Sequence, residues 1–283
     1  ISNLILSNCK LNTDILLAIM KKVKAKKQYG QNFLKDTAIL DRIIQSMPLN
    51  NNYIVEIGPG LGDLTKNLVK YKDLTAYEVD TDLISILKSK FAIQIEEGKL
   101  KLIHTDVLVA WEKQETLHDG KYDLIANLPY YIATNIILRA FEDKNCEHII
   151  VMVQKEVAEK FTAKVNDKDY SSLGIITELI SIDSRILFDV PPESFDPPPK
   201  IISSILYIKK DIDKYLDKDF NKFLKACFVQ PRKKLSKNLT SVLSKDAIFE
   251  IYKELNIDDN VRPHEVSSSL YSQMHTRVKD GRN

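Results

Sequence analysis

The sequence predicts an α/β protein built on a mainly parallel sheet, followed by a small all-helical domain. Short apolar runs typical of buried strands alternate with helical patterns from about residue 37 to residue 208. Beyond Lys209 the strand patterns stop and helical patterns alone continue. We therefore expect a sheet domain with a basic N-terminal arm over residues 20–208 and a helical domain over residues 209–283. Sheets of this kind bind ligands at the C-terminal ends of their strands.

The individual elements follow from the length and period of the apolar patterns. One expected strand begins at residue 53, and the others span residues 74–77, 101–104, 122–126, 149–153, 185–190 and 203–208. The expected helices span residues 37–47, 133–141, 155–162, 172–181, 220–228, 232–243, 247–255 and 267–278. Two more helices are expected to end near residue 70 and to begin near residue 82.

The stretch from Lys121 to Ile132 is the most informative part of the chain. Its apolar run stops abruptly at Asn127-Leu128-Pro129-Tyr130. Pro129 lacks a main-chain N–H and disfavours helical geometry at the residue before it, so the chain must turn here with its carbonyls free. The side-chain oxygen of Asn127 beside such a carbonyl offers two acceptors for an exocyclic amino group, and the ring of Tyr130 can stack on the base. Adenine N6 fits this description.

Three further features lie at predicted strand ends. The turn Gly58-Pro59-Gly60-Leu61-Gly62 lets backbone approach a ligand, but it lacks the GxGxxG spacing typical of pyrophosphate binding. It therefore suits a nucleoside, or it is only a tight turn. Glu78, about twenty residues on, could accept both ribose hydroxyls, or it could cap the helix near Asp82. Asp106, after the next strand, could accept from an adenine amino group.

A fourth candidate, Phe195, lies in the loop PPESFDPPPK. The prolines at 191, 192, 197, 198 and 199 stiffen this loop, so the aromatic ring is held on a rigid support. Two interpretations stay open. Phe195 could contact a ligand, or it could only fasten the loop to the sheet.

Charge is segregated along the chain. Residues 1–36 carry a net charge of +5, residues 37–208 carry −8, and residues 209–283 carry +5. The basic arm at Lys21–Lys27 and the cluster Arg232-Lys233-Lys234 contribute to the two basic flanks. These flanks could form a cleft for a polyanion, or they could be an ordinary solvated surface.

The three cysteines are far apart and show no metal-ligand spacing, so the sequence supports neither a disulfide framework nor a metal site. We infer a cytoplasmic protein. No uninterrupted apolar run approaches the roughly 20 residues of a membrane span, so no membrane partner is expected. Residues 1–19 precede Met20, and we hypothesise that Met20 is the native start. The alternative is that residues 1–19 form a short amphipathic helix.

Several segments together resemble one known family, the small-subunit (16S) ribosomal RNA adenine N6-dimethyltransferases. These are a branch of the S-adenosylmethionine-dependent methyltransferases with a Rossmann-like sheet. The segments that carry the resemblance are Gln31–Leu34, Val55–Gly60, Asn127–Tyr130, Gln154–Val157, Val190–Pro192, Phe195 with Pro197–Lys200, and Gln230–Lys234. Their order and spacing, over about Lys26 to Leu270, make the resemblance specific. One departure is Asn135, where many members have a proline.

The resemblance implies a role for each candidate residue. For S-adenosylmethionine, Asn32 and the main chain of Leu34 would line the methionine end, with Gly58 packed against the cofactor. Glu78 would hold the ribose and Asp106 would contact the adenine. Asn127 would join the cofactor and target sites. Family members dimethylate two adjacent adenosines in a hairpin loop near the 3′ end of small-subunit rRNA, during assembly of the immature small ribosomal subunit. The helical domain would then bind RNA, and we expect a monomer.

The expected mechanism needs no strong base. The Asn127 side chain and the Leu128 carbonyl would accept the target amine and favour a pyramidal nitrogen, while Tyr130 and Phe195 would hold the flipped base. Two alternatives remain. The sister family that dimethylates large-subunit rRNA shares this chemistry, although Gln230–Lys234 and the Phe195 loop favour the small-subunit branch. A non-catalytic RNA-binding assembly factor would keep the fold without the chemistry.

Overall fold

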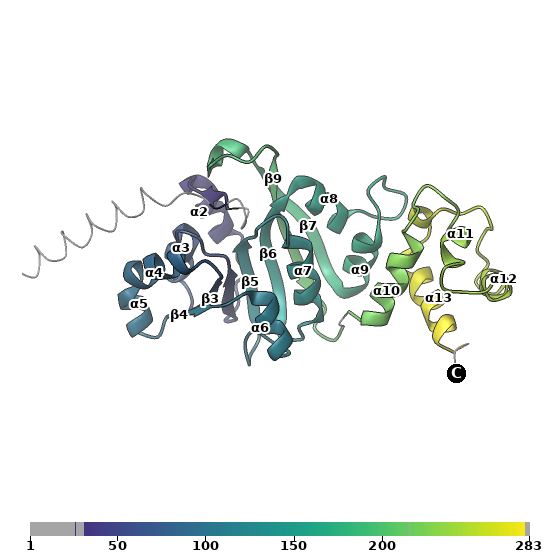
Figure 1. The fold of residues 1–283 in the computed structure, drawn as a ribbon, viewed down its shortest axis with the longest axis horizontal. Helices are drawn as coiled ribbons and strands as arrows, with labels where there is room; N and C mark the ends of the chain where they lie inside the picture. The colour runs from purple at the N-terminus through teal and green to yellow at the C-terminus, as the bar shows by residue number, and fades with distance from the viewer. Residues whose placement is uncertain (1–25, 27–30, 215, 281–283) are drawn as a thin grey trace, which may run out of the picture. The chain divides into compact units, whose positions relative to one another are not determined.

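The computed structural model describes residue 26 and residues 31–214 and 216–280 (Figure 1). The predicted extension at residues 1–19 and the basic arm, apart from Lys26, lie outside the described residues. The described chain forms two compact units. Unit 1 comprises the described residues through Lys155 together with Leu187–Leu206, and unit 2 comprises Glu156–Ile186 together with the described residues from Tyr207 onward.

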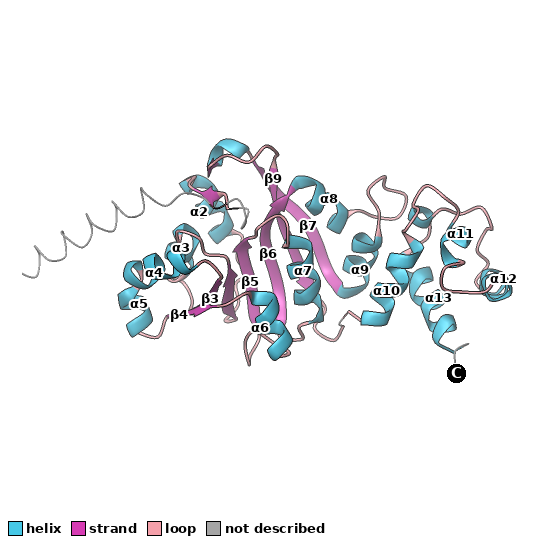
Figure 2. Ribbon diagram, viewed as in Figure 1, coloured by secondary structure: helices cyan, strands magenta, loops and turns pink. Residues whose placement is uncertain are grey.

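Within the described residues, the main sheet has seven strands in the order β4-β3-β2-β5-β6-β9-β7 (Figure 2). They are β2 (Tyr53–Ile57), β3 (Leu74–Glu78), β4 (Leu100–His104), β5 (Tyr122–Asn127), β6 (Cys146–Gln154), β7 (Ser181–Val190) and β9 (Ser203–Lys210). The pairs β4–β3, β3–β2, β2–β5 and β5–β6 are all parallel. This mainly parallel sheet confirms the predicted fold class.

The strand order reverses at β2, which pairs with β3 on one side and with β5 on the other. The chain runs outward from β2 through β3 to β4, then returns to β5 on the opposite side. Such a reversal leaves a crevice at the C-terminal ends of the two central strands, because the connections that follow them leave in opposite directions. The ends of β2 and β5 are therefore the expected place for a ligand.

The central strands form because their residues are apolar and β-branched and can be buried on both faces. Ile54 and Val55 of β2 and Leu124 of β5 are fully buried. Each such side chain contributes about 2 kcal/mol relative to the exposed state. Their register is fixed by the pairs Ile54↔Leu74 and Val55↔Leu124. Burial of this core holds the strand ends that carry the polar candidate residues.

Helices cover the sheet of unit 1 (Figure 2). They are α2 (Thr37–Gln45), α3 (Asp63–Leu68), α4 (Thr81–Lys90), α5 (Ala92–Glu96), α6 (Val107–Lys113) and α7 (Ala133–Glu142). Acidic N-caps begin three of them, since side chains of Asp36, Asp80 and Asp106 accept bonds from first-turn N–H groups. A separate two-stranded sheet pairs β1 (Phe33–Leu34) antiparallel with β8 (Phe195–Asp196).

Unit 2 is mainly helical. Its helices are α8 (Lys155–Thr162), α9 (Ser172–Ile180), α10 (Lys218–Cys227), α11 (Leu235–Leu239), α12 (Lys245–Glu254) and α13 (Ser268–Asp280). Helix α10 contacts α9, α11 and α13, and α9 contacts α13. Leu224, Leu239 and Met274 are fully buried among these helices. Tyr271, also fully buried, donates to the carbonyl of Pro263 at 2.8 Å and so keeps its hydroxyl paired.

One predicted helix is wrong in its extent. The pattern over residues 232–243 predicts a long helix, but α11 spans only Leu235–Leu239. The cause is Asn238, whose side chain exchanges hydrogen bonds with the main chain of Gln230 and so holds the segment before α11 in a turn. Arg232 and Lys233 therefore lie in that turn, ahead of the helix, and Lys234 is the residue that precedes its first turn.

Most other predicted elements are confirmed, including α8 with both of its boundaries. Sequence patterns did not predict β1, β8, α5 or α6. Among the residues that the structure describes, no helix combines the length and the apolar character needed to cross a membrane.

Candidate active site

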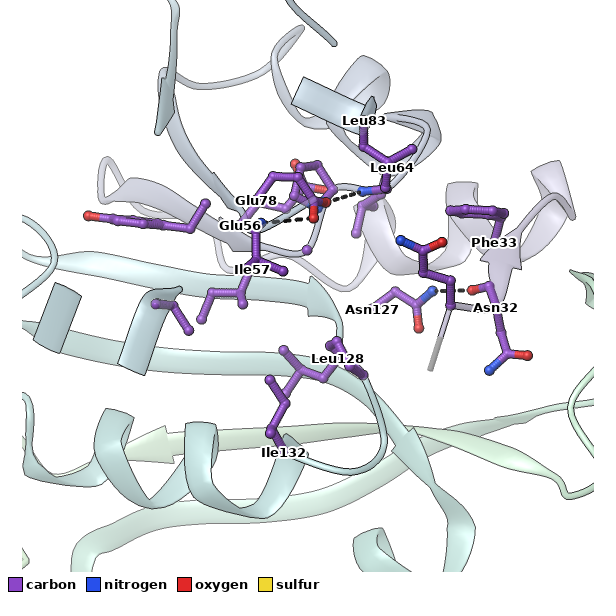
Figure 3. Close-up of a pocket in the computed structure, with 18 of the residues that line it drawn as sticks. Asn32, Phe33, Glu56, Ile57, Leu64, Glu78, Leu83, Asn127, Leu128 and Ile132 are labelled. Atoms are coloured by element: carbon purple, nitrogen blue, oxygen red, sulfur yellow. Dashed lines mark hydrogen bonds between the residues drawn. The ribbon is translucent and has the colours of Figure 1, made fainter. Parts of the chain in front are cut away.

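A pocket lies at the C-terminal ends of β2, β3 and β5, where the strand order reverses. It is lined by four stretches and by residues from the helices that follow the strands (Figure 3). The stretches are Gln31–Leu34, Glu56–Leu61, Tyr77–Val79 and Asn127–Ile132, joined by Asp63, Leu64, Leu83 and Thr105–Val107. All of these residues belong to unit 1.

The glycine-rich turn forms one wall of the pocket. Gly58 and Gly60 have φ angles of +67° and +60°, which side chains with a Cβ rarely adopt. A Cβ on Gly60 would come within 3.1 Å of the Phe33 ring, whereas one on Gly58 would be 3.7 Å from the Pro129 ring. Glycine at these positions keeps the β2 turn close to both the β1 segment and the β5 turn.

Glu78 ends β3 and is 5% exposed. Its Oε1 accepts from the main-chain N–H groups of Val79 and Asp80 at 2.9 Å each, and its Oε2 accepts from Gly60 N at 3.2 Å. Burial raises the pKa of this carboxyl, and the three N–H donors oppose that rise. Since a carboxylate oxygen can accept about two hydrogen bonds, Oε2 has room for one more donor.

The alternative role for Glu78, a cap on the next helix, does not match the geometry. Helix α4 is capped by Asp80, whose side chain accepts from Asp82 N at 3.0 Å. Asp80 is itself 2% exposed and binds Gln31 Nε2 at 2.9 Å and Lys26 Nζ at 2.7 Å. The β3 end therefore carries two buried carboxyls with different partners, and the segment before β1 is joined to it through Asp80.

Asp106 has two roles in this geometry. Its side chain caps α6 by accepting from Leu108 N at 2.8 Å, and it also lines the pocket as an exposed residue. The cap uses Oδ1, so Oδ2 can accept a further bond from a ligand.

Asn127 and Asn32 meet across the pocket (Figure 3). The Asn127 side-chain Nδ2 donates to the carbonyl oxygen of Asn32 at 3.1 Å. Because a carbonyl can only accept, this bond fixes the amide of Asn127 and turns its Oδ1 away from Asn32. Leu128 follows with a 2% exposed side chain, and its N–H donates to Met152 O at 3.2 Å. The end of β5 thus offers a side-chain acceptor beside the main-chain carbonyls of the turn.

The two predicted aromatic residues differ in their placement. Tyr130 lines the pocket, and its hydroxyl lies 2.7 Å from the Ser203 hydroxyl. Burial raises the pKa of the Tyr130 phenol. Phe195 is 4% exposed, lies opposite Leu34 in the small sheet, and is not part of the pocket lining. The structure therefore brings Asn32, Leu34, Gly58, Glu78, Asp106, Asn127, Leu128 and Tyr130 to one pocket and leaves Phe195 outside its lining.

Glu56 lines the same pocket, although no sequence pattern gave it a role. It is 1% exposed, and its Oε2 has no hydrogen-bond partner among the described residues. Burial raises its pKa from 4.5 to about 8, and the charge of the neighbouring Glu78 adds to the rise. A carboxyl inside an otherwise apolar strand, two residues before Gly58, was the signal that could have identified it.

An open sheet with this strand order, with carboxyl and amide acceptors at its strand ends, defines a Rossmann-like fold with a ligand pocket at the switch point. A family described as "Ribosomal RNA adenine dimethylase" matches residues 22–280 of the chain. The chain therefore belongs to the ribosomal RNA adenine dimethylase family. It is an S-adenosylmethionine-dependent enzyme that dimethylates adenine N6 in ribosomal RNA.

Two curated relatives cover almost the whole chain. "Ribosomal RNA small subunit methyltransferase A" of Aliarcobacter butzleri (strain RM4018) is 85% identical over 264 residues, which are 93% of this chain and 100% of that protein. The protein of the same name from Sulfurimonas denitrificans (strain ATCC 33889 / DSM 1251) is 51% identical over 264 residues, which are 93% of this chain and 97% of that protein.

Two solved structures share the fold. A dimethyladenosine transferase from Plasmodium falciparum has a TM-score of 0.73 at 23% identity, covering 88% of this chain and 98% of that chain. The 23S rRNA methyltransferase ErmE has a TM-score of 0.64 at 20% identity, covering 88% of this chain and 100% of that chain. At such identities, these likenesses concern the fold alone.

The pocket residues fit S-adenosylmethionine. The ribose hydroxyls, the adenine amino group and the ammonium group of the cofactor are hydrogen-bond donors, and the pocket contains acceptor oxygens on the carboxyls of Glu56, Glu78 and Asp106. The unpaired Oε2 of Glu56 can accept a donor, and so can the second position on Oε2 of Glu78. The absence of side chains at Gly58 and Gly60 leaves the wall open to close approach.

Proposed function

We propose that this enzyme dimethylates two adjacent adenosines in a hairpin loop near the 3′ end of small-subunit rRNA, during assembly of the immature small subunit. The observation that carries the proposal is the 85% identity, over its whole length, to a relative named for the small ribosomal subunit. The cytoplasm is the proposed location, and the enzyme acts as a monomer.

The proposed chemistry depends on acceptors at the end of β5. Adenine N6 is a poor nucleophile because its lone pair is delocalised into the ring. If Asn127 Oδ1 and the Leu128 carbonyl accept its two N–H groups, they stabilise a pyramidal nitrogen whose lone pair faces the donor. S-adenosylmethionine supplies the electrophilic methyl group. The nitrogen would take the methyl group as the carbon–sulfur bond breaks and a neutral thioether leaves. The methylated nitrogen is then cationic and acidic, so water can remove its proton and no strong base is needed.

The bond between Asn127 and Asn32 supports this assignment. It holds the side chain of Asn127 in one orientation before any ligand binds, so Oδ1 does not have to be ordered during the reaction. The same bond joins the cofactor-binding segment at Asn32 to the target site at Asn127. Asn32, Leu34, Gly58, Glu78 and Asp106 are the proposed cofactor-binding residues, with the roles set out above.

Tyr130 is proposed to stack on one face of the flipped adenine, because its ring lines the pocket beside Asn127. We assign the second face to Phe195. Since Phe195 is 4% exposed, it can contact the base only if its loop shifts when RNA binds.

The RNA backbone is proposed to bind the basic arm at Lys21–Lys27 and the cluster Arg232-Lys233-Lys234, with residues 209–283 acting as the RNA-binding domain. In unit 2, the side chains of all three cluster residues are exposed. Lys234 donates to Asn260 Oδ1 at 2.6 Å, which holds that amine at the surface. Exposed cations on a turn can follow a phosphate backbone without reading its sequence.

The test is methyl transfer to isolated ribosomal subunits. The full chain is incubated with labelled S-adenosylmethionine and either small or large subunits from cells that lack the modification, and the nucleosides are then analysed. Dimethyladenosine in the small subunit at two adjacent positions is the expected result. Labelling of the large subunit alone would overturn the proposed substrate and favour the sister family.

A further inference from the structure

Three large apolar side chains of unit 1 are exposed within two residues of Tyr130 or of its hydrogen-bond partner Ser203. Tyr131 is 60% exposed, Ile201 is 42% exposed and Ile202 is 45% exposed. Tyr131 also lines the pocket. We call these three residues the apolar rim. Exposed apolar residues that are scattered singly are ordinary, but a group beside a binding pocket indicates a contact surface.

One hydrogen bond joins the two chain segments that carry the rim residues. The hydroxyls of Tyr130 and Ser203 lie 2.7 Å apart, and Tyr131 directly follows Tyr130 while Ile202 directly precedes Ser203. Of the three rim residues, Tyr131 lines the pocket and is the direct neighbour of the residue proposed to stack on the target adenine.

The turn at the end of β5 gives its two tyrosines different environments. Ile132 N donates to Pro129 O at 3.2 Å, which makes Tyr130 and Tyr131 the central residues of the turn. Tyr130 is partly buried and bonded through its hydroxyl, whereas the ring of Tyr131 is mostly exposed. An aromatic ring held by a closed turn loses little conformational entropy when a flat ligand stacks on it.

We propose that the apolar rim binds the unpaired nucleobase next to the target adenosine, with Tyr131 stacking on its face and Ile202 packing against its edge. This inference rests on the proposed function, because it needs a target base that is flipped out of a single-stranded loop. Flipping one base unstacks its neighbour, and an aromatic side chain can replace the missing stacking partner. Every base has a π-face, so such a subsite tolerates any base.

The variants Tyr131→Ala, Tyr131→Phe and Ile202→Ala test the proposal. The probe is a hairpin RNA with two adjacent adenosines in its loop and 2-aminopurine at the nucleotide on either side. We expect Tyr131→Ala to weaken RNA binding at least about fivefold, the lower limit of base stacking on an aromatic residue. The 2-aminopurine fluorescence of its complex should exceed that of the wild-type complex. Tyr131→Phe should behave as wild type, and Ile202→Ala should weaken binding less.

Matched controls are available on the same unit. Tyr71 is 66% exposed and Ile93 is 65% exposed, and neither lines the pocket. Tyr71→Ala and Ile93→Ala should leave RNA affinity and fluorescence unchanged. The proposal is overturned if Tyr131→Ala matches Tyr71→Ala in both measurements. It is equally overturned if Tyr131→Ala loses affinity for whole small subunits but not for the hairpin, since the rim would then contact a protein.

The experiments distinguish a wrong assignment of the apolar rim from a wrong assignment of the substrate. Suppose the wild type forms dimethyladenosine in small subunits while Tyr131→Ala binds the hairpin normally. The proposed role of the apolar rim is then wrong, and the proposed substrate is retained. Suppose instead that small subunits are not methylated, but Tyr131→Ala still loses hairpin affinity and raises fluorescence. The proposed substrate is then wrong, and the proposed role of the apolar rim is retained. S-adenosylmethionine affinity, measured by calorimetry, should be unchanged in Ile202→Ala, because Ile202 does not line the pocket.

Discussion

The hydroxyls of Tyr130 and Ser203 lie 2.7 Å apart and join the turn after β5 to the first residue of β9. Ser203 is fully buried, Tyr130 is half-buried, and the bond between them is partly buried. It links the residue proposed to stack on the target base to a strand that lies two places away in the sheet. The position of the Tyr130 ring therefore depends on a contact between segments about 70 residues apart in the chain.

Removing either hydroxyl should have the same consequence. Tyr130→Phe and Ser203→Ala should each lower the free energy of unfolding by about 1 kcal/mol, since each breaks one partly buried hydrogen bond. Each should raise KM for RNA more than it lowers kcat, because the ring remains but is held less firmly. A double-mutant cycle checks the pairing: the double variant should lose little more than either single variant. Fully additive losses would mean that the two hydroxyls act independently.

Glu78→Ala should weaken cofactor binding before it affects any later step. The variant removes the Oε2 position proposed for the ribose and also the acceptor of Gly60 N, which helps hold the glycine turn. Calorimetry with S-adenosylmethionine measures the loss, which we expect to be tenfold or more, or about 1.4 kcal/mol. Glu96→Ala, on exposed α5, is the matched control. Unchanged affinity in Glu78→Ala would remove Glu78 from the cofactor site.

Glu56 should make the stability of the cofactor-free protein depend on pH. Its pKa is raised from 4.5 to about 8, so the folded state keeps the proton where the unfolded chain has lost it. Stability that is fully present below about pH 4.5 is therefore lost as pH rises toward 8, by at most about 1.4 kcal/mol per pH unit. Glu56→Gln removes this loss, so its free energy of unfolding relative to wild type should rise between pH 5 and pH 8.

Urea unfolding at several pH values measures this difference. Glu96→Gln, which changes an exposed carboxylate, provides the comparison. A constant difference between Glu56→Gln and wild type across this range would show that Glu56 is not protonated in the folded state.

Replacing Arg232, Lys233 and Lys234 with Gln should weaken RNA binding whatever the RNA sequence. Each phosphate that the variant no longer neutralises should reduce the slope of log affinity against log salt by somewhat less than one unit, because fewer counterions are released. Cofactor affinity should not change, since these residues belong to unit 2 and the cofactor pocket to unit 1. Substitution of Lys222 on α10 and of Lys245 and Lys253 on α12 with Gln, which removes the same three charges from exposed positions of unit 2, controls for the change in net charge alone. An unaltered slope with unaltered affinity would exclude the cluster from RNA binding.

The parts of the fold that sequence predicted are those fixed by local chemistry. Pro129 forces the turn that ends β5, and the apolar runs of β2 and β5 can only be buried strands. The small helix α6 was missed because Asp106 was interpreted only as a ligand residue, although it is also the N-cap. The extent of α11 was mispredicted because Asn238 bonds to main chain eight residues away, which periodicity does not reveal.

Some residues of the candidate site could likewise be predicted from the sequence, and others could not. Gly58, Glu78, Asp106 and Asn127 lie at the C-terminal ends of strands or within two residues of them, so their approach to one pocket could be expected from the topology. The burial of Phe195 could not, because it depends on the pairing of β8 with β1 across about 160 residues of chain. The unpaired oxygen of Glu56 likewise depends on how α3, α4 and the neighbouring strand pack around it.

The central claim is that Asn127 acts on the target amine. Asn127→Ala removes Oδ1 and the bond to Asn32 but leaves the basic residues untouched. The most direct measurement is the single-turnover rate of methyl transfer to small subunits, made with RNA and S-adenosylmethionine at concentrations that saturate the variant. We expect a rate below about a hundredth of wild type with RNA affinity nearly unchanged. A rate above about a tenth of wild type, a loss of less than roughly 1.4 kcal/mol, would contradict it.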